Sequence, residues 1–520
     1  MQIKQTIAKA LKKHHKWDIL SISYVILLTS LSIIRWNIYP IFIDIYYHIA
    51  AMQGYNIANG ITLNAYWEYA PFGRVQLYPP LLHIFMLTLL KMKFSIPFIA
   101  QITSFIMFPL TLFTIWFVIS KVYNEKIAFF STILLGSIVP FFWQSSVTSA
   151  ASLAQILGLL SFYAIDKNRK VATPILFTLL LYSHIAIPYF YITSFIIYGL
   201  FKRDRRKLIF NSTAISFIFF SPWFVHTLYN LKYLHPRNAV MHSAMLVPKP
   251  IPLYIFIWFF GIIGMTFSIK KKNEYIWPLV LLLSLIPIAF SYPERFWSAH
   301  AFIPLAILGG SGLFAVSNIS IRRKNRIPTA IKNTAIIMII TAIVLFTPTL
   351  RIGYNTRITT SYSLLPMLIK KPEQILNRNL KSKSLLTKKN FELADFIINH
   401  SSVKDTIYVS NGPLADFIFA FTGRCVSSGM LKEVKPYKRP LPTDCTLFVI
   451  EGNVDGLPPI LNDHFTLLGK SGGYTIFKNK FTNKGCSVPK PIAPLNEIFI
   501  AIYFSFLIAV IDLSKNIDRK

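Results

Sequence analysis

Acidic residues are scarce in this sequence. Its 520 residues include 21 Asp and Glu against 54 Lys and Arg, and 14% of the chain is charged whereas 53% is hydrophobic. A soluble protein of this size has far more charge, about a quarter of its residues. Apolar runs that approach or exceed the roughly 20 residues of a bilayer-crossing helix recur along the chain. The composition therefore predicts a polytopic, mainly helical membrane protein.

Cysteine is also rare, and the familiar nucleotide-binding motifs are missing. The three cysteines, Cys425, Cys445 and Cys486, all fall in one long polar region near the C-terminus. Their spacing fits neither a zinc site nor a redox motif. If this region lies outside the cytoplasm, two of them can form a disulfide and leave one thiol over. The sequence has no Walker loop, no dinucleotide fingerprint and no internal repeat of fixed period.

The formal net charge of +33 arises largely from short basic clusters between the apolar runs. This distribution is typical of cytoplasmic loops that face anionic lipid, and it argues against nucleic-acid binding. Several lysines precede the first apolar run, so we expect a cytoplasmic N-terminus and a retained first span. Asp44, which follows that span, is then outside.

A topology of twelve spans with both termini cytoplasmic places every short basic loop on the cytoplasmic side. These spans are expected near residues 18–39, 96–120, 127–143, 150–165, 171–201 (two short spans), 208–228, 251–269, 275–290, 300–318, 331–350 and 492–513. The 13-residue segment 78–90 is too short to cross and is expected to lie at the outer surface. The predicted domains are a transmembrane domain over 1–350, with a first outward loop at 40–95, an extracytoplasmic region over 351–490, and a final helix and tail over 491–520.

The outward region 351–490 departs from the hydropathy pattern of the rest. We interpret 351–390 as a basic linker. Beyond it, "FELADFIINH" predicts a helix, "TIYVS" and "TLFVIEG" predict strands, and "HFTLLGKSGGYTIFKN" predicts a hairpin around Gly472 and Gly473. The pattern indicates a small α/β domain.

The first outward loop contains an unusual concentration of polar and aromatic side chains. Asp44, Tyr47 and His48 can share one helical face, which Tyr46 cannot join. A carboxylate at the membrane surface beside an imidazole suits a general base or a metal ligand. A helix cap with interfacial aromatic residues would explain the same pattern. Candidates in this loop for contacting a substrate are Tyr47, Glu68 and Arg74.

Two later turns supply the remaining candidate residues. "SYPERFWSAHAFIPLA" contains Arg295 and His300, and Arg295 could bind a lipid phosphate through its planar guanidinium. An ion pair with Glu294, or an arginine that reaches up to the headgroups, would explain this residue equally well. His184, near Pro188, is either a substrate contact or a hydrogen-bonded core histidine.

These features together resemble the GT-C class of membrane glycosyltransferases. The resemblance is carried by Asp44 followed by "YYH", by "YAPFGRVQLYPPL", by the Arg-aromatic turn that leads into "PLAILGGSGL", and by a terminal extracytoplasmic domain. Within this class, the branch whose start is most similar to this sequence is the oligosaccharyltransferase catalytic subunit, with its "D-x-Y-Y-H" motif. However, "PFFWQSSVTSAAS" lacks the second acidic motif of that branch, and no "WWDYG"-like signature is present.

The resemblance implies an enzyme that moves sugar from a polyprenyl-phosphate or diphosphate carrier to an acceptor on the outer face of the membrane. In this class the acid of the first outward loop is catalytic, a position that Asp44 matches, and Arg295 resembles the arginine that contacts the carrier phosphate. A divalent cation is compatible with this chemistry, but its usual partner acids are missing. The acceptor, whether glycan, lipid or protein, stays open.

Two other functions remain open from the sequence. A lipid or solute transporter would be expected to show inverted repeats and discontinuous helices with intramembrane charges. An inactive relative could instead bind envelope glycans as a scaffold.

Overall fold

The computed structural model describes residues 16–235, 251–271, 275–291, 293–319, 329–352, 356–370, 384–452, 454, 457, 459–481 and 485–515. Three features considered above lie outside these ranges: the lysines before Lys16, the basic cluster at 322–326, and residues 371–383 of the expected linker.

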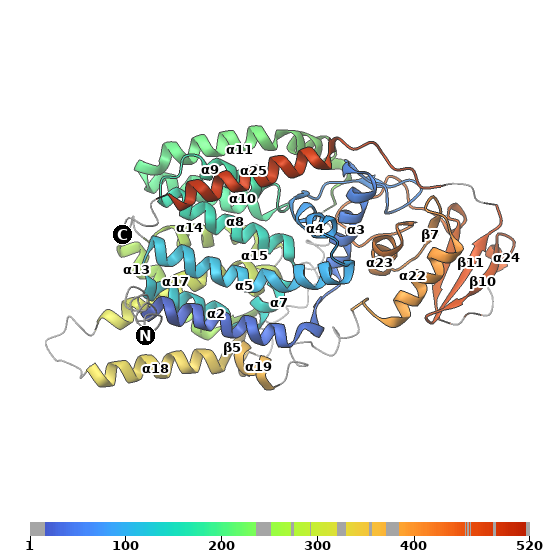
Figure 1. The fold of residues 1–520 in the computed structure, drawn as a ribbon. Coiled ribbons are helices and arrows are strands. Elements are labelled where there is room, and N and C mark those ends of the chain that lie inside the picture. Colours follow the sequence, from blue (N-terminus) through green and yellow to red (C-terminus); the bar gives the residue numbers. More distant parts are fainter. Residues whose placement is uncertain are drawn as a thin grey trace, which may run out of the picture.

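The chain forms a helical bundle with a smaller domain at one end (Figure 1). Five described helices are long and apolar enough to cross a membrane, or six if one bent pair is a single span. These five are α2 (Lys16–Ile34), α5 (Ile96–Val122), α8 (Ser149–Asp166), α11 (Arg203–Tyr229) and α25 (Leu495–Ser514). The chain is thus a multi-pass membrane protein, whereas the count of twelve spans stays a prediction.

Shorter apolar helices occupy the other expected spans. They are α9 (Ala172–Leu181), α10 (Ile187–Phe201), α13 (Ile255–Lys270), α14 (Trp277–Ser284), α15 (Ile286–Ser291), α17 (Phe302–Ile319) and α18 (Thr329–Leu345). The segment 171–201 does form two helices, as expected. The start of α2 and the end of α25 lie at the same end of the bundle, away from the smaller domain (Figure 1).

Two expected helices are interrupted in the structure. The segment 127–143 is divided into α6 (Glu125–Gly136) and α7 (Val139–Val147), bent by 79°. Pro140 cannot sit inside a continuing helix, so it takes the first turn of a new one. The segment 331–350 stops being helical at Leu345, because Pro348 and two β-branched threonines favour the strand that follows.

That strand belongs to a three-stranded sheet that the sequence did not predict. Its strands are β4 (Ile251–Tyr254), β5 (Phe346–Ile352) and β6 (Arg357–Tyr362), all antiparallel. Helix α19 (Leu364–Lys370) follows. Residues 351–352 and 356–370, interpreted above as the start of a linker, are therefore folded against the bundle.

The first outward loop lies between the bundle and the smaller domain (Figure 1). It contains α3 (Asp44–Ile57), α4 (Leu81–Lys91) and the short strands β1 (Gly60–Ile61), β2 (Asn64–Ala65) and β3 (Arg74–Val75). Helix α4 has 11 residues, about 16 Å, which is too short to cross a bilayer. Strand β1 pairs with β12 (Ala493–Pro494), directly before α25.

The smaller domain is the expected α/β unit. Its sheet has the order β10-β11-β9-β7-β8. The strands are β7 (Thr406–Tyr408), β8 (Cys425–Val426), β9 (Leu447–Glu451), β10 (Phe465–Ser471) and β11 (Tyr474–Asn479), and α22 (Lys388–His400) and α23 (Gly412–Thr422) accompany them. The predicted helix, both strands and the hairpin are confirmed. Gly472 and Gly473 take the positive φ values of a tight hairpin turn.

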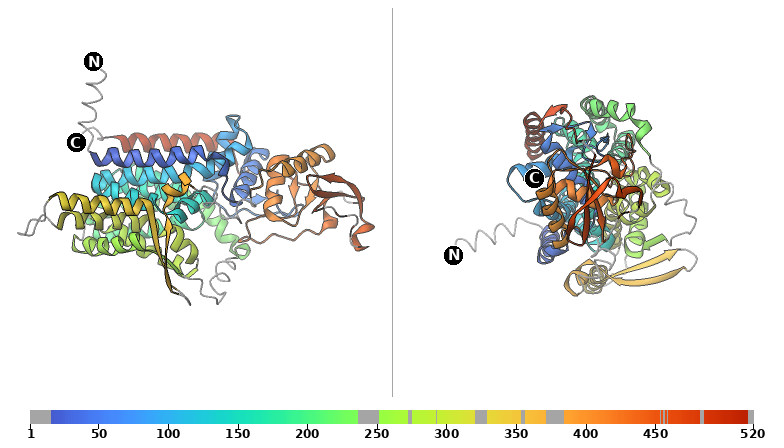
Figure 2. Two further views of the ribbon diagram at one scale, coloured as in Figure 1. Left: turned by 90° about the horizontal axis from the view of Figure 1, so that it is seen from below. Right: turned by 90° about the vertical axis from the view of Figure 1, so that its right-hand side faces the viewer.

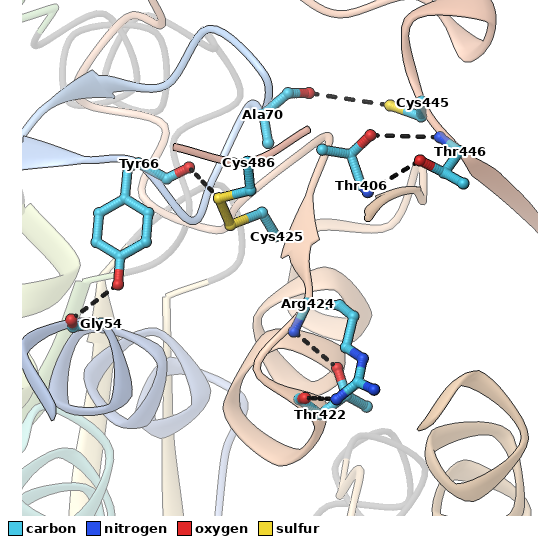
Figure 3. Close-up of a disulfide and its surroundings, with 10 residues drawn as sticks. All are labelled: Gly54, Tyr66, Ala70, Thr406, Thr422, Arg424, Cys425, Cys445, Thr446 and Cys486. Carbon is cyan, nitrogen blue, oxygen red and sulfur yellow. Dashed lines mark hydrogen bonds between the residues drawn. A yellow bond between two sulfur atoms is a disulfide. The ribbon is translucent and has the colours of Figure 1, made fainter. Parts of the chain in front are cut away.

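A disulfide joins Cys425 and Cys486, and Cys445 is a buried free thiol. Cys486 Sγ lies 4.0 Å from the Tyr66 carbonyl oxygen of the first outward loop (Figure 3). The sequence left the pairing open, and this arrangement is one that it allowed. Because disulfides persist mainly in oxidising compartments, the bond favours an extracytoplasmic domain.

Candidate active site

Asp44 is the first residue of α3 and lies where the bundle meets the smaller domain. The first turn of a helix has unpaired N–H groups and a partial positive charge, which suit a carboxylate. The residue is half-buried. Within the described part of the chain, its carboxylate makes no side-chain hydrogen bond and no ion pair. Asp44 is thus a carboxylate held near protein charges without being neutralised by contact.

The pKa of Asp44 reflects these surroundings. Burial raises it to about 6, the positive charge of Arg295 opposes this rise, and the negative charge of Glu433 adds to it. At neutral pH the carboxylate is ionised, yet it is a stronger base than an exposed aspartate. These properties suit a group that takes a proton from a substrate.

Arg295 ends the short helix α16 (Pro293–Arg295) and is followed by a π-helical turn, η3 (Phe296–His300). Its charge also acts on Tyr78, on His184 and on His300. The structure therefore brings the predicted arginine turn to the same region as Asp44, although the two lie far apart in the sequence.

Glu433 is a residue that sequence reasoning missed. Its carbonyl oxygen accepts a hydrogen bond from the His235 backbone N–H at 2.6 Å, and the neighbouring Val434 forms a β-bridge with Leu234. Its negative charge acts on both Asp44 and Tyr78. No local pattern singles out this glutamate, because only the docking of the smaller domain brings it here.

Tyr47 and His48 point into a buried aromatic cluster below Asp44. The Tyr47 hydroxyl donates to Gln76 Oε1 at 3.2 Å, and His48 Nδ1 lies 3.0 Å from His83 Nε2. Burial lowers the pKa of His48 to about 3, so its ring is neutral at physiological pH. In this structure the buried side chains of both residues pack and hydrogen-bond between α3 and the rest of the first outward loop. Tyr46, as expected, faces elsewhere, and its hydroxyl accepts from the Leu385 N–H at 2.9 Å.

The two remaining histidines have protein hydrogen-bond partners. His184 Nδ1 accepts from the backbone N–H groups of Ala186 at 3.0 Å and Ile187 at 3.2 Å, which caps the start of α10. His300 Nδ1 lies 2.9 Å from Gln155 Nε2. Both rings are buried, and the charge of Arg295 acts on both of them.

Glu68 and Arg74 form a buried ion pair, with 2.7 Å between Arg74 Nη2 and Glu68 Oε2 and neither side chain exposed. Arg74 Nη1 also donates to the Leu431 carbonyl oxygen at 2.7 Å. The buried carboxyl of Asp416 lies nearby, and the charges of Glu68 and Arg74 act on it. The pair thus joins the first outward loop to the smaller domain. Its enclosed position gives no support to the predicted substrate contacts.

A divalent cation does not fit this set of residues. Within the described ranges, no group of three or more His, Cys, Asp or Glu side chains could hold a metal ion. The charges of Glu433 and of Arg295 both act on Asp44 and on Tyr78, and the positive charge of Arg295 disfavours a second cation there.

Comparisons with known proteins yield a distant structural likeness. Neither a known protein family nor a curated protein matches the sequence. The chain is similar to the oligosaccharyltransferase AglB of Archaeoglobus fulgidus, solved with an inhibitory peptide and a dolichol-phosphate, with a TM-score of 0.43 and 12% identity over 84% of this chain and 69% of that one. The apo form of the Archaeoglobus fulgidus oligosaccharyltransferase gives a TM-score of 0.44 and 10% identity over 84% and 70%. A likeness with such low identity and TM-score carries no argument about function, so the function is inferred from this chain's own residues.

Proposed function

We propose that this protein is an inverting membrane glycosyltransferase. It moves a sugar from a polyprenyl-phosphate carrier to an acceptor hydroxyl at the outer face of the membrane. The observation that carries the proposal is the state of Asp44, a half-buried carboxylate with a raised pKa that forms no ion pair with any residue the structure describes and is close to the guanidinium of Arg295.

The proposed chemistry assigns one task to each of these two residues. Asp44 removes the proton from the acceptor hydroxyl as its oxygen attacks the anomeric carbon, and the carrier phosphate departs with the electron pair of the broken bond. Arg295 stabilises the charge that develops on the departing phosphate. One in-line attack inverts the anomeric carbon, so no second nucleophile is needed.

Glu433 adjusts the base in this mechanism. Its negative charge raises the pKa of Asp44 and partly offsets the opposite effect of Arg295. The smaller domain thus contributes to the site through one carboxylate as well as through its docking on α3.

Replacing Asp44 tests the proposal. Asp44→Asn keeps the size of the side chain and removes the base, so turnover should fall by roughly a hundredfold or more while KM changes little. Glu392→Gln, a substitution of a half-exposed carboxylate on α22, is the control and should leave turnover unchanged. The assay follows sugar transfer from purified polyprenyl-linked donor in proteoliposomes. Transfer that survives Asp44→Asn would remove this residue from the mechanism.

The same assay separates the two alternative functions. A transporter would move lipid or solute across the vesicle without making a glycosidic bond. A scaffold would bind glycan without turnover, and Asp44→Asn would not alter that binding.

A further inference from the structure

The sheet β4–β5–β6 has two faces of opposite character. Strand β5 is central, and its register places Thr349 opposite Tyr254 on one side and Thr359 on the other. Side chains alternate between the faces of a strand, so residues paired across the sheet share a face. One face is lined by hydroxyl groups, from Thr347, Thr349, Thr359 and Ser361.

This hydroxyl-bearing face lines a cavity of about 430 Å³. Val139 and Pro140, at the start of α7, also line the cavity, as does Met367 of α19. The volume lies within the range of sites for small ligands. Thr347 is 7% exposed, and its buried hydroxyl has no hydrogen-bond partner within the described structure. A buried polar atom without a partner is rare in proteins and indicates space for a ligand or water.

The other face of the sheet is apolar and exposed. Ile358 is 67% exposed, and Phe346 and Ile352 are each 43% exposed. In a soluble sheet the apolar face is normally the buried one. Strands β5 and β6 run across the direction of the helices, at the end of α18 (Figure 2). In a bilayer crossed by those helices the hairpin lies parallel to the membrane plane, so its apolar face can contact lipid.

Two arginines lie at the far end of the hydroxyl-bearing face. Arg351 on β5 and Arg357 on β6 are directly opposite each other, and both are exposed. Like charges in this position repel and destabilise a strand pair. An anion between the two guanidinium groups would remove that repulsion, and phosphate is an anion that arginine binds in two-point geometry.

Helix α7 connects this cavity with the candidate active site. Its nine residues span about 13 Å. Val139 and Pro140 at one end line the cavity, whereas the Trp143 ring lies 6.1 Å from the ring of Phe42, two residues before Asp44. A ligand in the cavity is therefore held beside the reaction site and not within it.

We propose that the cavity under β4–β5–β6 binds the head group of a glycosylated lipid, with sugar hydroxyls against the threonine and serine side chains and the lipid phosphate between Arg351 and Arg357. Hydroxyl side chains both donate and accept, which matches the hydroxyls of a sugar. The apolar outer face keeps this cavity at the bilayer surface, where the lipid chain can stay in the membrane. The inference rests on the proposed function for the class of its ligand.

The test uses the triple substitution Thr347→Val, Thr349→Val and Thr359→Val. Valine keeps the shape and the strand preference of threonine and removes only the hydroxyl groups. The matched control is Thr360→Val, which changes an exposed residue on the outer face of β6. Arg351→Gln, made separately, tests the phosphate end.

The probe is phosphatidylcholine vesicles that contain the polyprenyl-linked glycolipid fraction of the producing cells. The reference is the same fraction after hydrolysis of the glycosyl–phosphate bond, which removes the sugar and leaves the phosphate on the lipid. Wild type and Thr360→Val should bind the intact fraction at least roughly tenfold more tightly than the hydrolysed one, and the triple variant should lose this preference. Arg351→Gln should weaken binding of both fractions. Equal binding of the two fractions by wild type, or an unchanged preference in the triple variant, would overturn the inference.

Two further measurements separate this inference from the proposed function. Asp44→Asn should keep the binding preference while it loses transfer. In transfer assays the triple variant should raise the KM of a glycolipid acceptor and leave the donor KM unchanged, because the donor phosphate lies at Arg295 and not between Arg351 and Arg357. If the acceptor KM does not change, or the donor KM rises instead, while Asp44→Asn still abolishes transfer, the cavity assignment fails and the glycosyltransferase proposal stands.

Discussion

Arg74→Met should destabilise the contact between the smaller domain and the first outward loop far more than the loss of an exposed charged side chain would. Arg74 and Glu68 are both fully buried and 2.7 Å apart, and the substitution keeps an apolar stem of similar length. Glu68 would then be a buried carboxylate without its cation, keeping only the hydrogen bond from the Trp67 indole N–H at 3.3 Å, and breaking a buried ion pair in this way costs about 3–5 kcal/mol. The Glu68 carboxylate can avoid this cost by taking up a proton, which itself costs about 4 kcal/mol at pH 7 for a carboxyl with an ordinary pKa. We expect a loss of about 3–4 kcal/mol.

Hydrogen exchange measures this loss at the contact itself. The Ala70 N–H donates to the Val426 carbonyl oxygen at 2.9 Å, and the Val426 N–H donates to that of Trp67 at 2.8 Å. Both amides should exchange between roughly a hundredfold and a thousandfold faster in the variant, at 1.4 kcal/mol per factor of ten. Amides of β11 inside the domain sheet should change less.

Lys389→Met is the matched control for that experiment. The Lys389–Glu451 ion pair is 2.9 Å long, but its side chains are 50% and 61% exposed, so its loss costs at most about 1 kcal/mol. If Arg74→Met leaves the exchange of the Ala70 and Val426 amides within about tenfold of wild type, or affects them no more than Lys389→Met does, the argument for a buried charge contact is refuted.

Three further predictions concern a buried acid, the cysteines and the carrier. Burial raises the pKa of Asp416 well above its usual range, so the folded protein binds a proton that the unfolded chain releases. Stability should therefore fall as pH rises from about 4 towards that raised pKa. Asp416→Asn should flatten this pH dependence in unfolding experiments, and an unchanged slope would contradict the prediction. Thiol titration of the denatured, unreduced protein should detect one thiol and not three, and replacing Cys425 and Cys486 by alanine should cost about 4 kcal/mol for a loop of 61 residues. Arg295→Lys should raise the donor KM, because an ammonium cannot make a two-point contact with phosphate; an unchanged KM would exclude Arg295 as a carrier contact.

The sequence predicted the membrane character of the chain and most of the smaller domain for local reasons. Apolar runs and short basic clusters are visible without knowledge of the fold, and so is the alternating pattern around Gly472 and Gly473. The sheet β4–β5–β6 escaped prediction because β5 continues the apolar run of α18. Hydropathy alone does not distinguish a buried helix from a short strand in such a run.

The candidate site was predictable only in part. Asp44 and Arg295 stand out because charged residues beside apolar runs are costly and therefore unusual. Glu433 does not stand out, since a glutamate among lysines in a polar segment has a ready explanation as a surface residue. Glu68 and Arg74 were noticed for their charge, but only the packing of the smaller domain shows that they contact each other. The way in which distant segments dock against each other could not be predicted from the sequence.

The most direct test of Asp44 as the base is the pH dependence of kcat/KM for sugar transfer, measured for wild type and for Glu433→Gln. The ratio reports the ionisation of the free enzyme. Because the base must be ionised, activity should fall as pH drops through about 6, the raised pKa of Asp44. Removing the negative charge of Glu433 should move this midpoint to lower pH, since Glu433 contributes to the rise. A midpoint near 4, as for an ordinary aspartate, or a midpoint that Glu433→Gln does not move, would contradict the account.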